Sequence, residues 1–337
     1  MRGICAVLVI AGALFAAGCG SGSSQPESGR SQPEASQPLR DLTVTLDGAE
    51  GPENVGILMA QQRGYFADAN LSVSIFSPVL PARPVSYVET KQDDLGAAQE
   101  PQLALAKAKG ATIIAVGSLV HQPSAALIWL KKSHIGGIAG LKGKTIAIPG
   151  VPFQKKFLKN LLASNGLTLG DVKVKSVGYG TVPALVSGRA DAIFGSSNLE
   201  GVELESRGSK PVVTRLQSLG VPPYDELAMV AREDLVEKDP RLIRDFMTAV
   251  ARGTTAATED PKAAVDAIEK AGLGGSHVNR KTLEAQVAAT LPLLSKSGYM
   301  YPEESIRLTD WMRDEGMMAK SPRPPEMLTN EFASWQP

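Results

Sequence analysis

The chain has 337 residues, of which 43% are hydrophobic and 21% are charged, the composition of a soluble globular protein. This length exceeds that of a typical single domain and predicts two lobes. Lys and Arg together number 35, as do Asp and Glu, and this balance excludes a general electrostatic attraction to nucleic acid or to an anionic membrane.

The first residues form a targeting segment. Arg2 precedes an apolar run from Ile4 to Ala17, which has the length of a signal-peptide core and is too short to span a membrane. Residues 14–19 read Leu-Phe-Ala-Ala-Gly-Cys, which resembles a bacterial lipoprotein signal, although Ala16 replaces the usual aliphatic residue. We expect removal of residues 1–18 and attachment of lipid to Cys19. Ordinary secretory cleavage near Ala17 is the alternative.

The segment after the cleavage site is predicted to be a flexible tether, residues 19–40. It consists mostly of Ser, Gly, Pro, Gln and Glu, which cannot bury a core. Loss of Cys5 with the signal peptide leaves Cys19 as the single cysteine, which excludes an internal disulfide. The expected location is the extracytoplasmic face of the cell membrane, held there by lipid.

Residues 41–126 are predicted to form the first part of lobe one. Short apolar runs rich in β-branched residues are separated by turn-rich loops and by segments with helix start and stop signals. The predicted strands are 42–46, 71–76 and 113–116, and the predicted helices begin near Asn54 and at Gln102.

Residues 127–229 are predicted to form lobe two, and residues 230–337 a helical segment that returns to lobe one. In lobe two the predicted strands are 145–148, 172–177 and 190–194, and the predicted helices are 153–162 and 182–186. A strand at 227–231 carries the chain back. Asp239 and Asp260 each precede a proline and are predicted helix N-caps. Alternating strands and helices imply an α/β fold with parallel sheets.

Polar residues gather in the loops that follow the predicted strands. In an open α/β sheet these loops lie at the carboxyl ends of the strands, where ligands bind. Each residue taken alone is better explained as a helix cap or a solvated surface residue than as a ligand contact, but together they outline a two-lobed cleft lined by acceptors. Carboxylates at such a site suit a ligand that presents N–H donors. The candidate ligand-binding residues are Asp47, Glu53, Asn54, Gln99, Glu100, Gln122, Asn198, Glu200 and Tyr224, with Asp225 and Glu226 beside the last.

The sequence gives little support to catalysis or to a cofactor. No nucleotide-binding glycine loop and no Gly-x-Ser-x-Gly elbow is present. His121, His134 and His277 are too scattered to suggest a metal site or a Ser-His pair. We therefore expect no catalytic residue, no metal and no cofactor, and predict that the protein is not an enzyme.

Several strings spread over the mature chain resemble one family, the type II periplasmic solute-binding proteins of ABC importers. The similar branch is the one that binds thiamine-precursor pyrimidines, aromatic sulfonates and related solutes. The matching strings are 46–47 (Leu-Asp), 62–66 (Gln-Arg-Gly-Tyr-Phe), 71–73 (Leu-Ser-Val), 100–101 (Glu-Pro), 141–145 (Leu-Lys-Gly-Lys-Thr), 191–192 (Asp-Ala), 198–200 (Asn-Leu-Glu), 221–227 (Val-Pro-Pro-Tyr-Asp-Glu-Leu) and 328–330 (Leu-Thr-Asn).

The resemblance implies a type II periplasmic-binding-protein fold, with two α/β lobes, a central cleft and a hinge. It implies a monomer that captures a small amine- or amidine-bearing solute by lobe closure and delivers it to a permease and ATPase. Glu200 would pair with the amino group of a pyrimidine, and Asp47 and Glu100 would be wall residues. The hinge is expected near residues 126–130 and 228–231.

The chain departs from the pyrimidine-binding pattern at two places. The residue after Asp47 is Gly48 rather than Trp, and Ser196 and Ser197 stand where aromatic residues are common. Either another aromatic residue replaces them or the ligand is not a flat ring; the candidates are Tyr65, Phe153, Tyr179 and Tyr224. An anion site fits no better, because Pro152 removes a backbone donor. An enzyme of this fold in pyrimidine-precursor synthesis and a sensory lipoprotein remain alternatives.

Overall fold

The computed structural model describes residues 38–48, 51–78, 84–272 and 278–334. The predicted signal peptide, Cys19 and nearly all of the predicted tether therefore lie outside the described residues. No helix among the described residues combines the length and the apolar character needed to cross a membrane.

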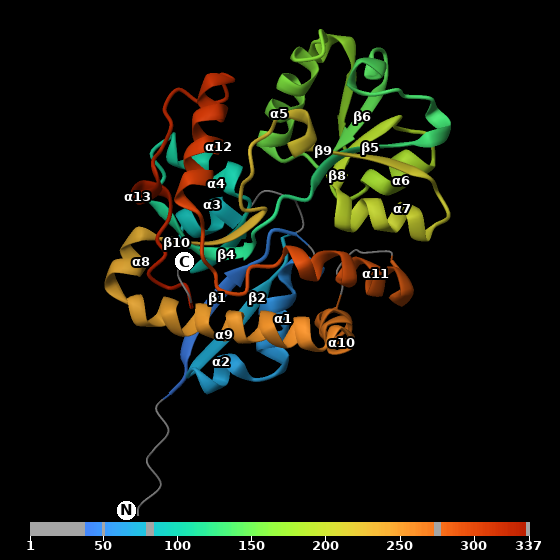
Figure 1. The fold of residues 1–337 in the computed structure, drawn as a ribbon. Helices are drawn as coiled ribbons and strands as arrows, with labels where there is room; N and C mark the ends of the chain where they lie inside the picture. Colours follow the sequence, from blue (N-terminus) through green and yellow to red (C-terminus); the bar gives the residue numbers. More distant parts are fainter. Residues whose placement is uncertain (1–37, 49–50, 79–83, 273–277, 335–337) are drawn as a thin grey trace, which may run out of the picture. The chain divides into compact units, whose positions relative to one another are not determined.

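Two five-stranded sheets form the framework (Figure 1). The strand order of the first sheet is β2 (Leu71–Phe76), β1 (Arg40–Thr45), β3 (Leu95–Ala98), β10 (Leu227–Arg232) and β4 (Ile113–Val120). The strand order of the second sheet is β7 (Lys173–Ser176), β6 (Thr145–Ile148), β8 (Ala192–Ser196), β5 (Ala125–Leu130) and β9 (Pro211–Arg215). This architecture confirms the predicted α/β fold of the periplasmic-binding-protein type.

The prediction of parallel sheets is correct only in part. β5 runs antiparallel to β8 and β9, and β10 runs antiparallel to β3 and β4. Both are the first strands after the chain passes from one sheet to the other. Ala125 pairs with Ser196, the last residue of β8, and Leu227 pairs with Val120, the last residue of β4. Each strand therefore starts at the edge where the parallel strands end, and runs away from it.

The two sheets are joined by residues 121–124 and by the segment from the end of β9 to residue 226. The hinges predicted at 126–130 and 228–231 fall inside β5 and β10. Both strands are buried and hydrogen-bonded on both sides, so they resist bending. The lobe boundaries predicted at 126 and 229 fall in the same strands. The connecting segments themselves lie outside the hydrogen-bonded strands of both sheets.

Helices cover the sheets. Asp239 and Asp260 are N-caps, as predicted, because their side chains accept hydrogen bonds from Leu242 N at 2.9 Å and Ala263 N at 3.0 Å. The helices are α1 (Val55–Gln62), α2 (Tyr65–Asp68), α3 (Pro84–Glu89), α4 (Glu100–Lys107), α5 (Pro152–Ala163), α6 (Thr181–Val186), α7 (Val202–Ser206), α8 (Glu233–Lys238), α9 (Pro240–Glu259), α10 (Pro261–Ala271), α11 (Arg280–Thr290), α12 (Pro302–Asp314) and α13 (Pro324–Met327).

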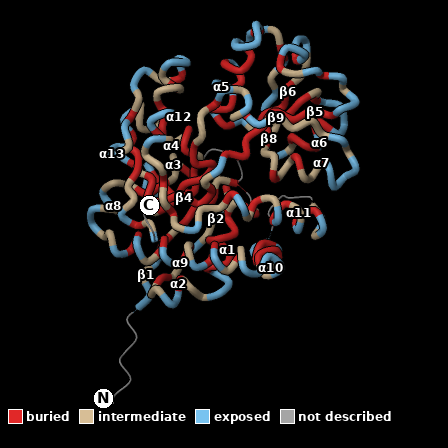
Figure 2. The backbone as a smooth tube through the Cα atoms, viewed as in Figure 1, coloured by how far each residue is buried: buried red, intermediate tan, exposed pale blue. Residues whose placement is uncertain are grey.

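One apolar core extends from the first sheet to the second through α4, α5 and α12 (Figure 2). Phe157 of α5 packs edge-on against Trp311 of α12, with ring centroids 5.1 Å apart. Asn160 Nδ2 donates to the carbonyl oxygen of Glu315 at 3.3 Å. The α12 segment thus contacts α5, a contact between distant segments that the sequence did not indicate.

Candidate binding site

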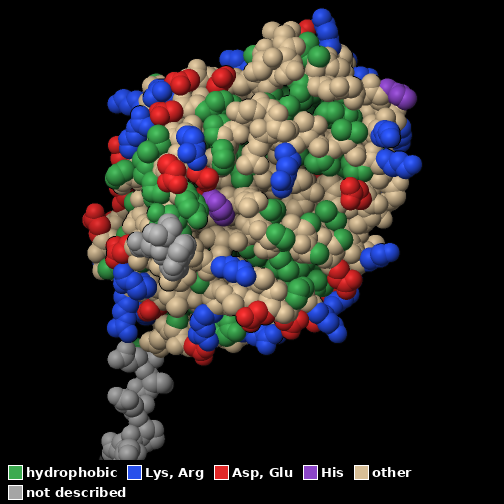
Figure 3. All heavy atoms as spheres, in the orientation of Figure 1, with side chains coloured by type: hydrophobic (Ala, Val, Ile, Leu, Met, Phe, Trp, Pro, Cys, Tyr) green, Lys and Arg blue, Asp and Glu red, His purple; other side chains and the backbone are tan. Residues whose placement is uncertain are grey.

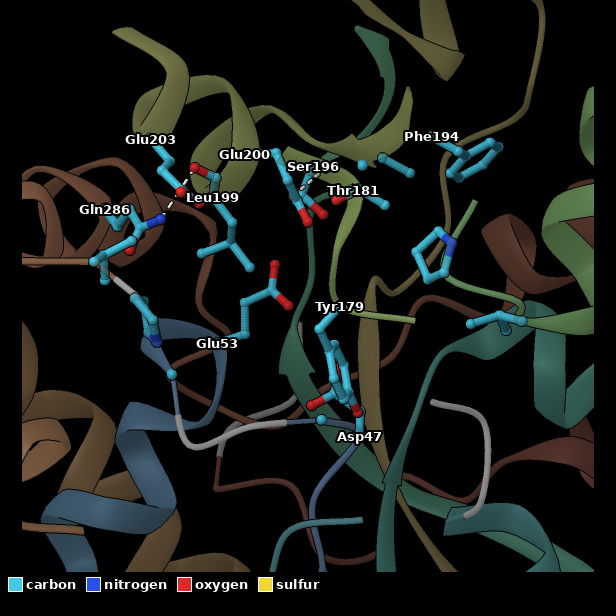
Figure 4. A pocket seen from close by; sticks show the side chains of 18 of the residues that line it. Asp47, Glu53, Tyr179, Thr181, Phe194, Ser196, Leu199, Glu200, Glu203 and Gln286 are labelled. Atoms are coloured by element: carbon cyan, nitrogen blue, oxygen red, sulfur yellow. Dashed lines mark hydrogen bonds between the residues drawn. The ribbon is translucent and has the colours of Figure 1, made fainter. Parts of the chain in front are cut away.

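A cavity of about 250 Å³ lies between the two sheets. Its walls come from the loops after β1, β3, β6, β7 and β8, from Ala125 and Glu226 beside the connecting segments, and from α11 (Figure 4). The loops that follow strands therefore converge on one space, as expected for an open α/β sheet. The volume suits a single substituted ring, since an engineered cavity of roughly 150 Å³ holds benzene.

Two carboxylates come from the loop after β1. Asp47 Oδ1 accepts a hydrogen bond from Asn54 Nδ2 at 3.0 Å, and burial raises the pKa of Asp47 to about 6. Glu53 Oε1 accepts from Asn198 Nδ2 at 3.1 Å and from Ser124 Oγ at 3.4 Å. Burial and the charge of Asp47 raise the pKa of Glu53 well above its ordinary range. Because Asn198 follows β8, the Glu53–Asn198 bond joins segments that follow strands of different sheets.

A third carboxylate, Glu200, comes from the turn after β8. Its Oε2 accepts from Ser196 N at 2.7 Å, and burial raises its pKa (Figure 4). A Cβ atom at Gly195 would lie only 3.0 Å from the Glu200 carboxyl carbon. Glycine at 195 therefore lets the carboxylate fold back over the end of the strand and face the cavity.

A fourth carboxylate, Glu226, is held by the connecting segments. Its Oε2 accepts from Ser124 N at 2.7 Å and Ala125 N at 3.1 Å, and its Oε1 accepts from Gln99 Nε2 at 2.9 Å. These bonds tie one connection between the sheets to the other. Both oxygens of Glu226 are engaged, so it is the carboxylate least available to a ligand.

Five of the nine predicted residues line the cavity: Asp47, Glu53, Asn54, Gln99 and Glu200. Asn198 is buried and does not line the cavity, but it holds a residue that does. Its Nδ2 donates both to Glu53 and to Thr290 Oγ1, the latter at 2.9 Å. The interlobe position of these residues is what their place at strand ends predicted.

Besides Asn198, three predicted residues do not line the cavity. Gln122 is exposed on the first connection. Tyr224 is buried in the apolar core, edge-on to Phe157 at 6.4 Å between ring centroids. Glu100 is fully buried on the far side of the second connection, where it accepts from Asp225 N at 2.8 Å and from Ser305 Oγ. The local direction of the backbone at each of these three positions keeps the side chain out of the cavity.

Glu100 belongs to a separate cluster behind the cavity. Burial and the charge of Asp225 raise the pKa of Glu100 to about 8. His121 Nδ1 lies 3.2 Å from Asp225 Oδ1, which raises the pKa of His121, and His121 Nε2 lies 3.8 Å from Glu304 Oε2. Ser118 Oγ also donates to Asp225. The cluster joins both connections to α12.

Among the four aromatic candidates, only Tyr179 lines the cavity. Its ring would lie 3.3 Å from a Cβ atom at Gly48, and its OH is 3.5 Å from Pro78 O (Figure 4). Burial raises its pKa to about 12. Tyr65 instead lies under the Arg252 guanidinium, and Phe153 is buried in the core. Tyr179 therefore supplies an aromatic side chain to the cavity, which the loop after Asp47 lacks.

Several lining residues were missed from the sequence. Gln154 stands on α5, Arg207 follows α7, and Leu283 and Gln286 stand on α11, where Gln286 Nε2 donates to Leu199 O at 3.0 Å. No strand end or turn marks them. Only the packing of α11 against the turn after β8 brings that helix to the cavity. In the described part of the chain, no group of three or more His, Cys, Asp or Glu residues could hold a metal ion.

Comparison with known proteins identifies relatives. Residues 51–264 match the model of the family described as NMT1/THI5 like. A putative thiamine biosynthesis protein of Haemophilus influenzae is 29% identical, over 83% of this chain and 88% of the relative. The formylaminopyrimidine-binding protein of Halalkalibacterium halodurans is 27% identical, over 76% of this chain and 75% of the relative.

Solved structures share the fold. The alkanesulfonate-binding protein SsuA of Xanthomonas axonopodis pv. citri aligns with a TM-score of 0.68 and 16% identity, over 87% of this chain and 99% of that one. The ligand-binding component of an ABC-type import system from Staphylococcus aureus aligns with a TM-score of 0.68 and 14% identity, over 88% of this chain and all of that one.

The comparisons overturn one expectation. The 4-amino-5-hydroxymethyl-2-methylpyrimidine phosphate synthase of Schizosaccharomyces pombe is 26% identical, over 88% of this chain and 86% of the relative. Further relatives carry the same enzyme name. The relatives thus include enzymes as well as binding proteins. The prediction that the chain is not an enzyme is therefore wrong, because similarity to this family does not exclude enzyme activity.

Proposed function

The chain belongs to the NMT1/THI5-like family, and on this premise we propose that it is the extracytoplasmic solute-binding component of an ABC importer. Its solute is a small thiamine-precursor pyrimidine or a related amine- or amidine-bearing compound. The protein acts as a monomer, held at the membrane by lipid on Cys19, and it delivers the solute to a permease and ATPase.

The observation that carries this proposal is the convergence of carboxylates from both sheets on one cavity. Asp47 and Glu53 come from the first sheet, and Glu200 from the second. A solute that donates hydrogen bonds to both sets contacts both lobes at once. Such a solute binds the closed form more tightly than the open form and shifts the equilibrium toward closure.

The connecting segments supply the hinge in this mechanism. Residues 121–124 and 221–226 lie outside the ladders of β4, β5 and β10, and Glu226 ties the two segments together. Rotation about them opens the cavity without breaking either sheet. Opening would break the hydrogen bond between Glu53 and Asn198, which follow strands of different sheets.

We expect Glu200→Ala to weaken solute binding by roughly 10- to 100-fold, the loss of one hydrogen bond to a charged group. Glu284→Ala should leave the affinity unchanged, because Glu284 is paired with Arg280 on the surface of α11. Calorimetric titration with 4-amino-5-hydroxymethyl-2-methylpyrimidine compares the two variants with the wild type. Equal affinities for all three proteins would remove Glu200 from the site.

Native mass spectrometry of the gently purified protein tests the proposal directly. A co-purifying small molecule that stays unchanged during incubation, and that dissociates intact, supports solute capture. A solute that is converted to a product would instead assign to this chain the enzyme activity named for some of its relatives.

A further inference from the structure

Three of the cavity carboxylates keep one oxygen without a side-chain donor. Asp47 is held through Oδ1, Glu53 through Oε1 and Glu200 through Oε2. Within the described residues, no side chain donates a hydrogen bond to the second oxygen of any of the three. The protein thus fixes each carboxylate with one oxygen and leaves the other for a ligand. In Figure 4 the Glu53 carboxylate points into the cavity, between Tyr179 and Leu199.

These carboxylates have no cation to balance them. Arg207 is the one basic residue lining the cavity in the described part of the chain, and it is paired with Glu203 at 2.7 Å. No Lys, Arg or His among the described residues forms an ion pair with Asp47, Glu53 or Glu200. The basic side chains visible on the surface in Figure 3 lie among acidic ones and are spread over the face shown. Asp47, Glu53 and Glu200 therefore lack a basic side-chain partner among the described residues.

Buried amide oxygens add to the excess of acceptors. Asn54, 3% exposed, donates through Nδ2 to Asp47, and its Oδ1 has no partner. Gln154, 6% exposed, also lines the cavity and its Oε1 has no partner. The Nδ2 of Asn54 is held by a carboxylate, and its Oδ1 is left as a buried acceptor without a partner. An unpartnered buried acceptor is unfavourable unless a ligand donor reaches it.

We propose that the cavity selects its solute as a cation with N–H donors on two sides, of the amidinium or aminomethyl-pyrimidinium class, and excludes solutes that carry phosphate or sulfonate. One side of the solute meets Asp47 and Glu53, and the other meets Glu200. This inference rests on the proposed function and names the charge class of its solute. It separates this site from anion sites built on free backbone donors, since Pro152 removes such a donor at the start of α5.

The raised pKa values of these groups agree with this charge class. Burial raises the pKa of Asp47 to about 6, and it also raises the pKa values of Glu53 and Glu200. Burial thus disfavours the ionised form of each group when no cation is bound. A bound cation favours the ionised forms, so it expels protons as it enters.

Three probes with one ring and different charges test the proposal. They are 4-amino-2-methylpyrimidine with a 5-aminomethyl group, a 5-hydroxymethyl group or the phosphate ester of the latter. We expect the aminomethyl probe to bind roughly 10- to 100-fold more tightly than the hydroxymethyl probe, as a charge-assisted hydrogen bond would give. We expect no measurable binding of the phosphate ester. Titrations in buffers of different ionisation enthalpy should show proton release with the aminomethyl probe at pH 6.

Two variants locate the effect. Glu53→Gln keeps the side-chain shape but removes the charge, so it should reduce both the preference for the aminomethyl probe and the proton release. Glu284→Gln, on the outer face of α11, should change neither.

The outcomes separate this inference from the proposed function. Binding of the phosphate ester as tight as that of the aminomethyl probe would overturn the charge class and leave solute capture standing. So would an unchanged probe preference in Glu53→Gln, or an anion found bound to the purified protein. Failure of every probe, with no co-purifying solute, would overturn solute capture and the charge class together.

Discussion

Replacing Gly253 by alanine should destabilise the protein by about 3 kcal/mol, near the upper end of the usual cost of overpacking. Gly253 lies where α9 crosses α1. A Cβ atom there would be 2.1 Å from Gly56 O and 2.8 Å from Ala60 N. Both obstacles are backbone atoms of a buried helix, so no side chain can move aside. Helix propensity favours alanine over glycine by about 1 kcal/mol, so the predicted sign is opposite to that of propensity.

Urea denaturation of Gly253→Ala against the wild type measures this loss. Thr255→Ala is the matched control, because Thr255 is exposed on the same helix and should change stability by no more than about 0.5 kcal/mol. Solute affinity should also fall in Gly253→Ala, since α1 begins directly after Glu53 and Asn54 and would be displaced. Wild-type stability in Gly253→Ala would mean that α1 and α9 are not in backbone contact.

Glu100→Gln should stabilise the protein at pH 8 to 9 and flatten its dependence on pH. The carboxyl of Glu100 is fully buried, and its pKa rises from 4.5 to about 8 in the folded state. Between these values the folded protein holds a proton that the unfolded chain has lost. The free energy of unfolding therefore falls as the pH rises through this window, by up to about 5 kcal/mol. Glutamine keeps the hydrogen-bonding shape and cannot ionise.

Neighbouring groups change stability in the same direction. The pKa of His121 is raised by its hydrogen bond to Asp225, so its contribution is present at low pH and is lost as the pH rises through the folded value. Some pH dependence should therefore remain in Glu100→Gln. Denaturation between pH 5 and pH 9 gives the comparison, with Glu89→Gln, at an exposed position on α3, as the control. A variant less stable than the wild type at pH 9 would show that the ionised Glu100 carboxylate does not destabilise the folded protein and that its pKa is not raised there.

Much of the fold could be predicted from local patterns. β-Branched alternation marked β1 and β2, and an aspartate before a proline marked the starts of α9 and α10. These patterns depend on residues a few positions apart, so the sequence carries them completely. The antiparallel course of β5 and β10 escaped prediction, because it depends on which end of the other sheet the chain enters.

The site was predictable to the same extent. Asp47, Glu53 and Glu200, which follow strands, line one cavity in the structure, and their role in binding stays a prediction. The same reasoning failed for Glu100, because a residue one position further along a turn can face the opposite side. Adjacent residues Asp225 and Glu226 show this directly, since one faces His121 and the other binds Ser124 N.

The sequence by itself determined the two α/β halves, the helix caps and the wealth of carboxylates at strand ends. Only the tertiary structure decided which carboxylates share a cavity, that Tyr179 supplies its aromatic wall, and that α11 closes it with Gln286. The physical reason is the distance along the chain over which each interaction acts. Backbone periodicity and capping act within a few residues, whereas the direction of a side chain and its partners depend on packing between segments far apart in the chain.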